Sequence, residues 1–251
     1  MKEMTFTEHL EELRKTLIRV VMILGVSFMV CYGFGEYIAE FLLKPLRNVL
    51  ESTNSGSIVY LGLLDKVMSQ LQVAFWTSLI ISSPLWFIEV WRFIKPGLYS
   101  YEVRAVKPFL FIGFLFFCLG ISFGYFLVFP LTFETLMSFG VENVKATISL
   151  KEYLILASKV LVFLGLVFQL PNILLILGFM GIVTKYSLRS MRRYVYVGFA
   201  VLSAFLTPPD PYTLLALWFP LIMLFEVGIL IVALIVHPYL AKQHSGDTSE
   251  K

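Results

Sequence analysis

Four polar side chains lie where they could support binding chemistry. Gln169 and Glu226 are set deep in apolar stretches, whereas Glu12 and Glu102 lie in charged segments beside such stretches. A carboxylate inside a membrane costs about 2.5 to 3.5 kcal/mol on insertion scales, so Glu226 should face protein or water. Two carboxylates at one membrane surface could hold two guanidinium groups through paired hydrogen bonds, which an ammonium group forms less well. This pattern predicts a docking surface for arginine-bearing peptides.

Other kinds of chemistry lack their sequence signatures. The chain has no nucleotide-binding loop, Ser-His-Asp set, HExxH motif or metal-type Cys/His spacing, and its three histidines are scattered near the ends. Cys31 and Cys118 lie inside apolar runs, where they are interpreted as small core residues. We therefore expect no enzymatic activity, no metal or cofactor, and no nucleic-acid partner.

The composition predicts an all-α integral membrane protein. Of the 251 residues, 58% are hydrophobic and only 15% are charged, whereas a soluble domain is near half apolar and a quarter charged. The apolar residues form blocks of about 20, long enough for a helix to cross roughly 30 Å of hydrocarbon. We predict one transmembrane domain, residues 1–251, with a flexible cytoplasmic tail at 237–251. The expected spans are about 17–43, 69–94, 106–129, 153–180, 194–206 and 212–236.

Local signals predict where several helices begin and end. Thr5 and Glu8 have capping-box spacing, so a helix should start there and either run along the membrane surface or lead straight into the first span. Pro45 is expected to end that helix. The fifth span, 194–206, would be only about 20 Å long, and its mismatch should tilt neighbouring helices or thin the bilayer.

The distribution of basic residues predicts the orientation. With six spans, 14 of the 20 Lys and Arg residues fall on the side of both termini and 6 on the other. Cytoplasmic loops are enriched in these residues, so both termini are placed in the cytoplasm. The loop at 91–107 lies on that side, and Glu102 is its only acid. Loops 46–68 and 131–152 lie together on the opposite side.

The polar residues also allow simpler interpretations. Glu102 could sit in the first turn of a helix capped by Ser100, where the helix dipole keeps it ionised. Gln169 and Glu226 could hold helices together. The sharper alternative is a wet groove open to a partner helix, which the short fifth span favours.

Four stretches are similar to one known family, TatC, and the resemblance covers residues 7–236. The family is the multi-span receptor of the twin-arginine protein translocase. The stretches are HLEELRK at 9–15, SSPLWFIEVWRFIKPGLYSYEVR at 82–104, FGYFLVFP at 123–130 and LTPPD at 206–210.

The resemblance implies a fold and a function. Six helices should form a concave, glove-like bundle in the bacterial cytoplasmic (inner) membrane, with helices 5 and 6 short or irregular. The protein should bind the twin-arginine signal peptides of folded precursors at its cytoplasmic face. It should then recruit the single-span proteins TatA and TatB for export driven by the proton-motive force. A homo-oligomer within a larger hetero-complex is expected.

Family positions carry over to individual residues. The recognition acids correspond to Glu12 and Glu102, and four residues should shape the surface around them: Arg14, Phe93, Pro96 and Tyr99.

Other matches fall on the transport path. Pro45 and Asp210 match periplasmic positions linked to transport, while Thr207 lies where the partner helices dock. Glu226 matches an acid of the sixth span. The chain departs from the family at Gln169, where relatives often have Glu, and at Leu214, where many have Gln.

Two alternatives from other classes of protein remain open. A small-solute or ion transporter could use Gln169 and Glu226 as midplane ligands, although no inverted repeat of the kind common in transporters is evident. A scaffold that only holds other membrane proteins is the second.

Overall fold

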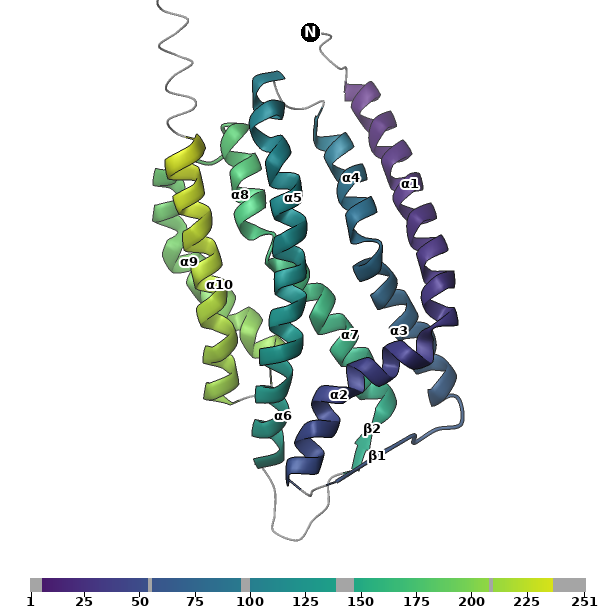
Figure 1. Cartoon of the computed structure of the whole chain (residues 1–251). Coiled ribbons are helices and arrows are strands. Elements are labelled where there is room, and N and C mark those ends of the chain that lie inside the picture. The colour runs from purple at the N-terminus through teal and green to yellow at the C-terminus, as the bar shows by residue number, and fades with distance from the viewer. Residues whose placement is uncertain (1–5, 54–55, 96–99, 139–146, 208–209, 237–251) are drawn as a thin grey trace, which may run out of the picture. The chain divides into compact units, whose positions relative to one another are not determined.

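The computed structural model describes residues 6–53, 56–95, 100–138, 147–207 and 210–236 (Figure 1). Its helices group into two compact units. Unit 1 comprises Met1–Gly97 and Gly120–Leu164, and unit 2 comprises Leu98–Leu119 and Gly165–Lys251. Helices α5 (Ser100–Phe123) and α7 (Leu150–Val167) contribute residues to both units. The prediction of one transmembrane domain stays a prediction.

Helix α1 (Phe6–Gly33) leads without a break from the charged N-terminal motif through the first predicted span. At 28 residues it is about 42 Å long, so the sequence alternative of a separate surface helix does not apply. Helix α2 (Gly35–Thr53) then leaves in a new direction (Figure 1). A Cβ on Gly35 would lie 2.8 Å from Cγ of Gln70, so this bend needs a glycine where it approaches α3.

The prediction that Pro45 ends the first helix is wrong. Pro45 is buried inside α2, which continues to Thr53. A proline lacks the N–H that would bond the carbonyl four residues earlier, here Phe41. The hydroxyl of Tyr125 donates a hydrogen bond to that carbonyl at 2.8 Å. Because a side chain supplies the missing donor, the helix continues through the proline.

The second predicted span is two helices, α3 (Asp65–Ile81) and α4 (Ser83–Ile94), bent by 57° at Ser82. Pro84 lies in the first turn of α4, where its missing N–H costs no helical hydrogen bond. The Ser82 hydroxyl donates to the Ser78 carbonyl at 2.6 Å, and this carbonyl also accepts the Ser82 N–H at 3.0 Å.

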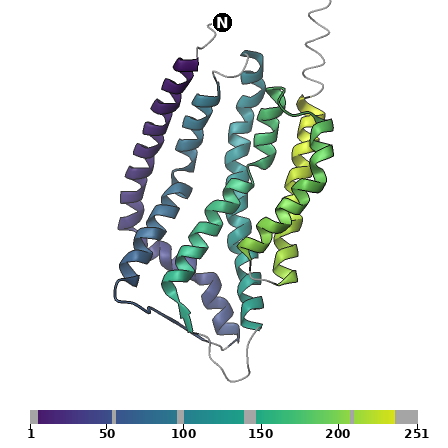
Figure 2. The same cartoon turned by 180° about the vertical axis from the view of Figure 1, so that it is seen from behind.

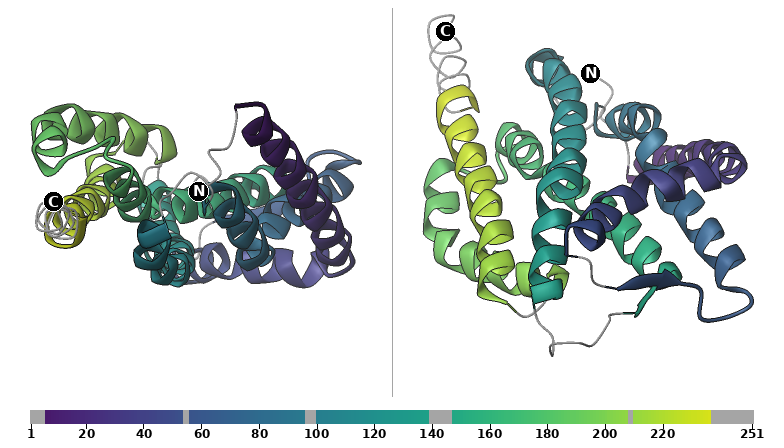
Figure 3. Two further views of the ribbon diagram at one scale, coloured as in Figure 1. Left: turned by 90° about the horizontal axis from the view of Figure 1, so that it is seen from above. Right: turned by 60° about the horizontal axis from the view of Figure 1, so that its bottom comes forward.

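Two short parallel strands join the loops that the sequence analysis places on the same side. Strand β1 (Ser57–Val59) pairs with β2 (Thr147–Ser149), with Ser57 opposite Thr147 (Figure 3). Beside them, the Lys151 ammonium binds the Asp65 carboxylate at 2.9 Å. This ion pair and the Gly62 N–H, which donates at 2.7 Å, lower the pKa of Asp65, which lies before the predicted span at 69–94.

In unit 1, a π-helical segment at Gly124–Val128 connects α5 to α6 (Phe129–Ser138). A Cβ on Gly124 would lie 2.8 Å from Leu164 Cδ1 of α7, so the glycine allows a close helix–helix approach. The wider π turn begins at this glycine and positions Tyr125 against α2.

Unit 2 contains α8 (Leu170–Phe179), α9 (Lys185–Leu206) and α10 (Pro211–Ile231), which ends in a π-helical segment at Val232–Val236 (Figure 2). Helix α10 packs on α8 where a Cβ on Gly228 would lie 2.6 Å from Leu174 Cδ1. The Trp218 indole of α10 donates to the Tyr196 carbonyl of α9 at 2.8 Å.

The helical membrane fold predicted from composition is confirmed. Within the described residues, four helical stretches are long and apolar enough to cross a bilayer, and the bent α3–α4 pair is a fifth candidate. The four are Thr7–Gly33, Leu110–Ser138, Leu150–Phe179 and Pro211–Val236. The remaining predicted span, 194–206, is the apolar part of α9, whose first turns are charged. A count of six spans therefore stays a prediction.

Candidate functional site

The residues predicted to recognise peptides begin on α1, where it packs against α4 in unit 1. The His9 ring stacks on the Phe93 ring at a centroid distance of 4.7 Å. Glu12 follows one turn along α1 and is half-buried, and Thr16, a further turn on, is buried. The residues at 9, 12 and 16 share one helix face because three- and four-residue steps return to the same side. This face, with Phe93, is called the α1–α4 seam.

Helix α1 turns its leucines away from the seam. Leu10, Leu13 and Leu17 are 44 to 61% exposed. This polarity suits a helix whose apolar side meets lipid and whose ionisable groups face protein. The acid next to Glu12 is engaged elsewhere, because Glu11 pairs with Lys15 at 2.8 Å.

A three-charge cluster continues along the contact between α1 and α4. Glu89 is buried, with one carboxylate oxygen 2.9 Å from Arg19 Nη1 and the other 2.6 Å from Arg92 Nη1. Arg19 comes from α1, and Arg92 is one turn beyond Glu89 on α4. A carboxylate this buried is costly unless it is paired. The cluster thus ties α1 to α4 through Glu89, and its two cations exceed its one anion.

The other predicted recognition residues are only partly described. Arg14 is exposed on α1. Pro96 and Tyr99 lie outside the described residues. Glu102 belongs to the first turn of α5, as its helix-start interpretation predicts, but its side chain lies outside the described part of the structure.

Gln169 holds the junction between α7 and α8 against α5 in unit 2. It is buried, and its Nε2 donates to the Gly113 carbonyl at 2.9 Å. A Cβ on Gly113 would lie 2.4 Å from Asn172 Nδ2 and 3.1 Å from Gln169 Oε1. Gly113 therefore allows two amide side chains to approach the α5 backbone, an arrangement in which Gln169 holds helices together.

Glu226 performs a similar task between α9 and α10. Its carboxylate lies 2.6 Å from Arg192 Nη2 and accepts a second hydrogen bond from the Tyr196 hydroxyl. Both partners belong to α9 and Glu226 to α10, so a single acid joins the two helices. The acid that the sequence places within the sixth span is thus paired, as its insertion cost requires.

The turn between α9 and α10 gives two predicted residues structural tasks. Thr207 is buried, and its hydroxyl donates to the Ser203 carbonyl at 2.8 Å. Asp210 is the buried N-cap of α10, accepting a hydrogen bond from the Thr213 N–H at 2.8 Å and another from its hydroxyl. An N-cap carboxylate satisfies a free helical N–H and complements the helix dipole.

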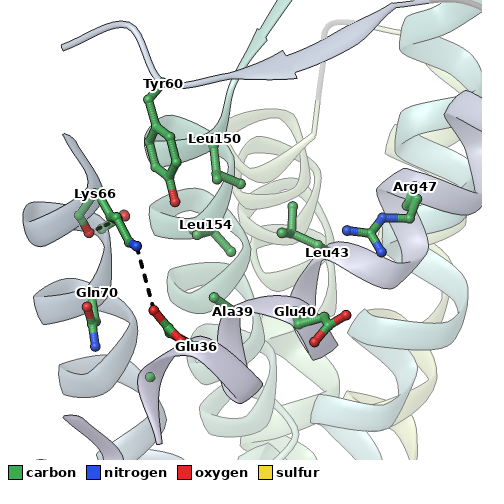
Figure 4. A pocket seen from close by; sticks show the side chains of 12 residues that line it. Glu36, Ala39, Glu40, Leu43, Arg47, Tyr60, Lys66, Gln70, Leu150 and Leu154 are labelled. Atoms are coloured by element: carbon green, nitrogen blue, oxygen red, sulfur yellow. Dashed lines mark hydrogen bonds and ion pairs between the residues drawn. The ribbon is translucent and has the colours of Figure 1, made fainter. Parts of the chain in front are cut away.

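A cavity of about 270 Å³ lies beside α2 in unit 1 (Figure 4). Ala39, Leu43, Leu150 and Leu154 contribute its apolar wall. Charged side chains lie around this wall, including the Glu36–Lys66 pair, whose N–O distance is 3.6 Å. This cavity was not predicted from the sequence, because its walls combine α2 and α3 with α7, which is distant in the chain. The charged and apolar parts together could accommodate an amphipathic group.

Sequence reasoning also missed the Arg19–Glu89–Arg92 cluster. The spacing of Glu89 and Arg92 is a visible signal, because residues three apart on a helix are neighbours. Nothing in the local sequence points from Glu89 to Arg19, 70 positions away.

Comparisons with known proteins all lead to one family. The family model for the Sec-independent protein translocase protein (TatC) matches residues 8–220. TatC of Desulforapulum autotrophicum is 38% identical over 225 residues, covering 90% of this chain and 83% of the relative. TatC of Escherichia coli K12 is 33% identical over 221 residues, covering 88% and 85%. A crystal structure of the twin arginine translocase receptor TatC matches with a TM-score of 0.78 and 31% identity, covering 90% of this chain and 99% of that one.

Proposed function

The chain belongs to the TatC family of Sec-independent protein translocase proteins, and on that premise we propose that it is the translocase's receptor for twin-arginine signal peptides. As a TatC protein it is a membrane component of the protein translocase. The finer proposal is that it binds folded precursors at the cytoplasmic face and recruits TatA and TatB for export driven by the proton-motive force. The task is recognition and transport, not catalysis.

The observation that carries this proposal is the α1–α4 seam. The His9–Phe93 stack holds the HLEELRK motif of α1 against the end of α4, and Glu12 lies half-buried one turn from His9. Only residues 95–99 separate α4 from the first residue of α5, the helix that carries Glu102 in its first turn. In the proposal, Glu12 and Glu102 each receive one guanidinium of the signal peptide.

Energetics limit what these two acids can contribute alone. An exposed ion pair gives only about 0.2 to 1 kcal/mol, too little for a selective complex. The partial burial of Glu12 reduces screening, and the planar guanidinium can form two parallel hydrogen bonds that an ammonium cannot. The apolar segment of the signal peptide would supply much of the remaining affinity. Selectivity for Arg over Lys thus comes from geometry, and affinity from apolar contact.

The intramembrane polar residues support a different part of the proposal. Gln169 and Glu226 hydrogen-bond within unit 2, which favours their interpretation as residues that hold helices together. We propose that TatA and TatB dock near Thr207 on α9 and α10, whose relative position Glu226 maintains. Both termini lie in the cytoplasm and the protein in the bacterial inner membrane, in accord with the excess of Lys and Arg on that side.

A crosslinking experiment tests the receptor proposal. A twin-arginine peptide carrying a photoreactive group is added to inner-membrane vesicles that contain the full chain. Glu12→Gln and Glu102→Ala should each lower peptide crosslinking several-fold. Glu11→Gln is the matched control, because Glu11 is next to Glu12 on the same helix but pairs with Lys15.

Two control measurements show whether lost crosslinking reflects lost peptide recognition. A Lys-Lys peptide should crosslink weakly to the native chain, and all variants should insert into the membrane in equal amounts. Crosslinking that is unchanged in both Glu12→Gln and Glu102→Ala would exclude these acids from the peptide site and with them this form of the proposal.

A further inference from the structure

One row of side chains along α9 is basic in its first half and apolar in its second half. Residues at every fourth position of a helix are surface neighbours and form a ridge. The first three members of this ridge are basic, and the last three are apolar and exposed by 64, 54 and 88%. We call these six residues the α9 ridge: Lys185, Arg189, Arg193, Val197, Val201 and Phe205.

The three cations of the ridge are electrostatically unfavourable within the chain itself. Like charges four residues apart on a helix repel each other. Lys185 is also the first residue of α9, where the helix dipole disfavours positive charge, and the first turn has no acid. Among the described residues, the acid that contacts this part of α9 is Glu226, and it pairs with Arg192, which is not in the ridge. The basic half of the ridge therefore has the charge of an anion site.

Two tyrosines flank the ridge at the level of its cations. Lys185 Nζ lies 5.0 Å from the ring centroid of Tyr186, and Arg193 Cζ lies 4.8 Å from that of Tyr194. Both rings are exposed, by 66 and 64%. Exposed tyrosines beside Lys and Arg are typical of the headgroup region of a membrane, where a ring can meet apolar chains and water together.

The length of α9 places its cations within reach of lipid phosphates. The apolar part at 194–206 has 13 residues, or about 20 Å of helix, against roughly 30 Å of hydrocarbon. An apolar part this short draws headgroups toward the charged end of the helix or thins the bilayer around it. Arg193 and Arg189 should then lie at the level of the phosphates, while Val197 and Val201 lie beside the acyl chains.

We propose that the α9 ridge binds an acidic phospholipid. Its phosphate lies on Lys185, Arg189 and Arg193, and an acyl chain runs along Val197, Val201 and Phe205. The order of the ridge, cationic and then apolar, matches the order of headgroup and chain in such a lipid. The inference rests on α9 lying in a bilayer and does not depend on signal-peptide binding.

Lipid retention by the purified full chain tests this proposal. The chain is exchanged into detergent with phosphatidylglycerol or phosphatidylethanolamine, and bound lipid is counted by native mass spectrometry. The native chain should retain phosphatidylglycerol selectively. Arg189→Gln with Arg193→Gln should lower its affinity roughly thirtyfold, since each basic residue near a membrane contributes a several-fold factor. Lys44→Gln with Lys95→Gln, which removes one exposed cation of α2 and one at the end of α4, should leave retention unchanged.

Three measurements distinguish loss of the lipid site from misfolding and a lipid site from a simple phosphate site. Arg189→Lys with Arg193→Lys keeps the charges and should keep the lipid. On the native chain, raising the salt from about 0.05 to 0.5 M should release it. The proposal is overturned if the Gln pair retains phosphatidylglycerol like the native chain, or if phosphatidylethanolamine binds equally well. Displacement of the lipid by an equal concentration of inorganic phosphate would also overturn it.

Discussion

The Tyr125 hydroxyl donates a hydrogen bond to the Phe41 carbonyl at 2.8 Å, 84 positions away in the chain. The carbonyl is the one that Pro45 leaves without its helical donor. The rings of the two residues also stack, with centroids 4.5 Å apart. This contact connects two motifs that are separate in the sequence, the proline of α2 and the FGYFLVFP stretch.

Replacing Tyr125 with Phe should destabilise the protein by about 1 to 3 kcal/mol, because the Phe41 carbonyl would lose its donor. In a Pro45→Ala background, where an N–H is restored, the same change should cost less. Thermal unfolding in detergent of both single variants and the double variant measures this coupling. Tyr37→Phe, at an exposed position of the same helix, is the control. Strictly additive effects would show that the hydroxyl does not substitute for the missing amide.

Gly113→Ala should destabilise unit 2 by about 1 to 3 kcal/mol, because the new methyl group would overlap the Asn172 side chain. Gly198→Ala is a matched control in α9, since nothing lies within 4 Å of a Cβ at that position. An alanine there should be neutral or stabilising by up to about 1 kcal/mol. Unfolding followed by circular dichroism compares the two. Equal effects would contradict the close approach of Gln169 and Asn172 to α5.

Glu89→Gln should weaken the contact between α1 and α4, because two arginines would face a neutral amide. Breaking a fully buried pair costs about 3 to 5 kcal/mol, and the 57% exposure of the Arg92 side chain lowers that figure. Glu11→Gln, which breaks the exposed pair with Lys15, should cost less than about 1 kcal/mol. Hydrogen exchange of α1 reports the difference. An α1 that exchanges equally fast in both variants would rule out the cluster as its anchor.

The Lys151–Asp65 pair should give the fold a pH dependence of definite sign. The pKa of Asp65 is lowered, so its contribution to stability is present above the unfolded value, near 3.9, and is lost as the pH falls through the lower folded value. Asp65→Asn should therefore lower the melting temperature at pH 7, and the difference from the native chain should shrink below about pH 4. A difference that stays constant from pH 7 to pH 3 would contradict this assignment.

Much of the fold could be predicted from the sequence alone. Hydrocarbon thickness sets a minimum length for an apolar helix, so most spans are visible as blocks of suitable length. The cost of an intramembrane acid likewise predicted that Glu226 faces protein or water, and it pairs with Arg192. The motifs at 9–15 and 82–104 pointed to the TatC family. These inferences succeeded because each depends on residue type and local spacing.

Contacts between distant residues could not be predicted in this way. Pro45 is a helix breaker by its own chemistry, and only the arrival of Tyr125 allows α2 to continue. The partner of Gln169 is a backbone carbonyl in α5, available because residue 113 has no side chain. Arg19 and Glu89 meet only once α1 lies on α4. Sequence determined which segments are helical and apolar, because both follow from local composition. Tertiary structure decided which unsatisfied donor meets which acceptor, because that depends on how the helices pack.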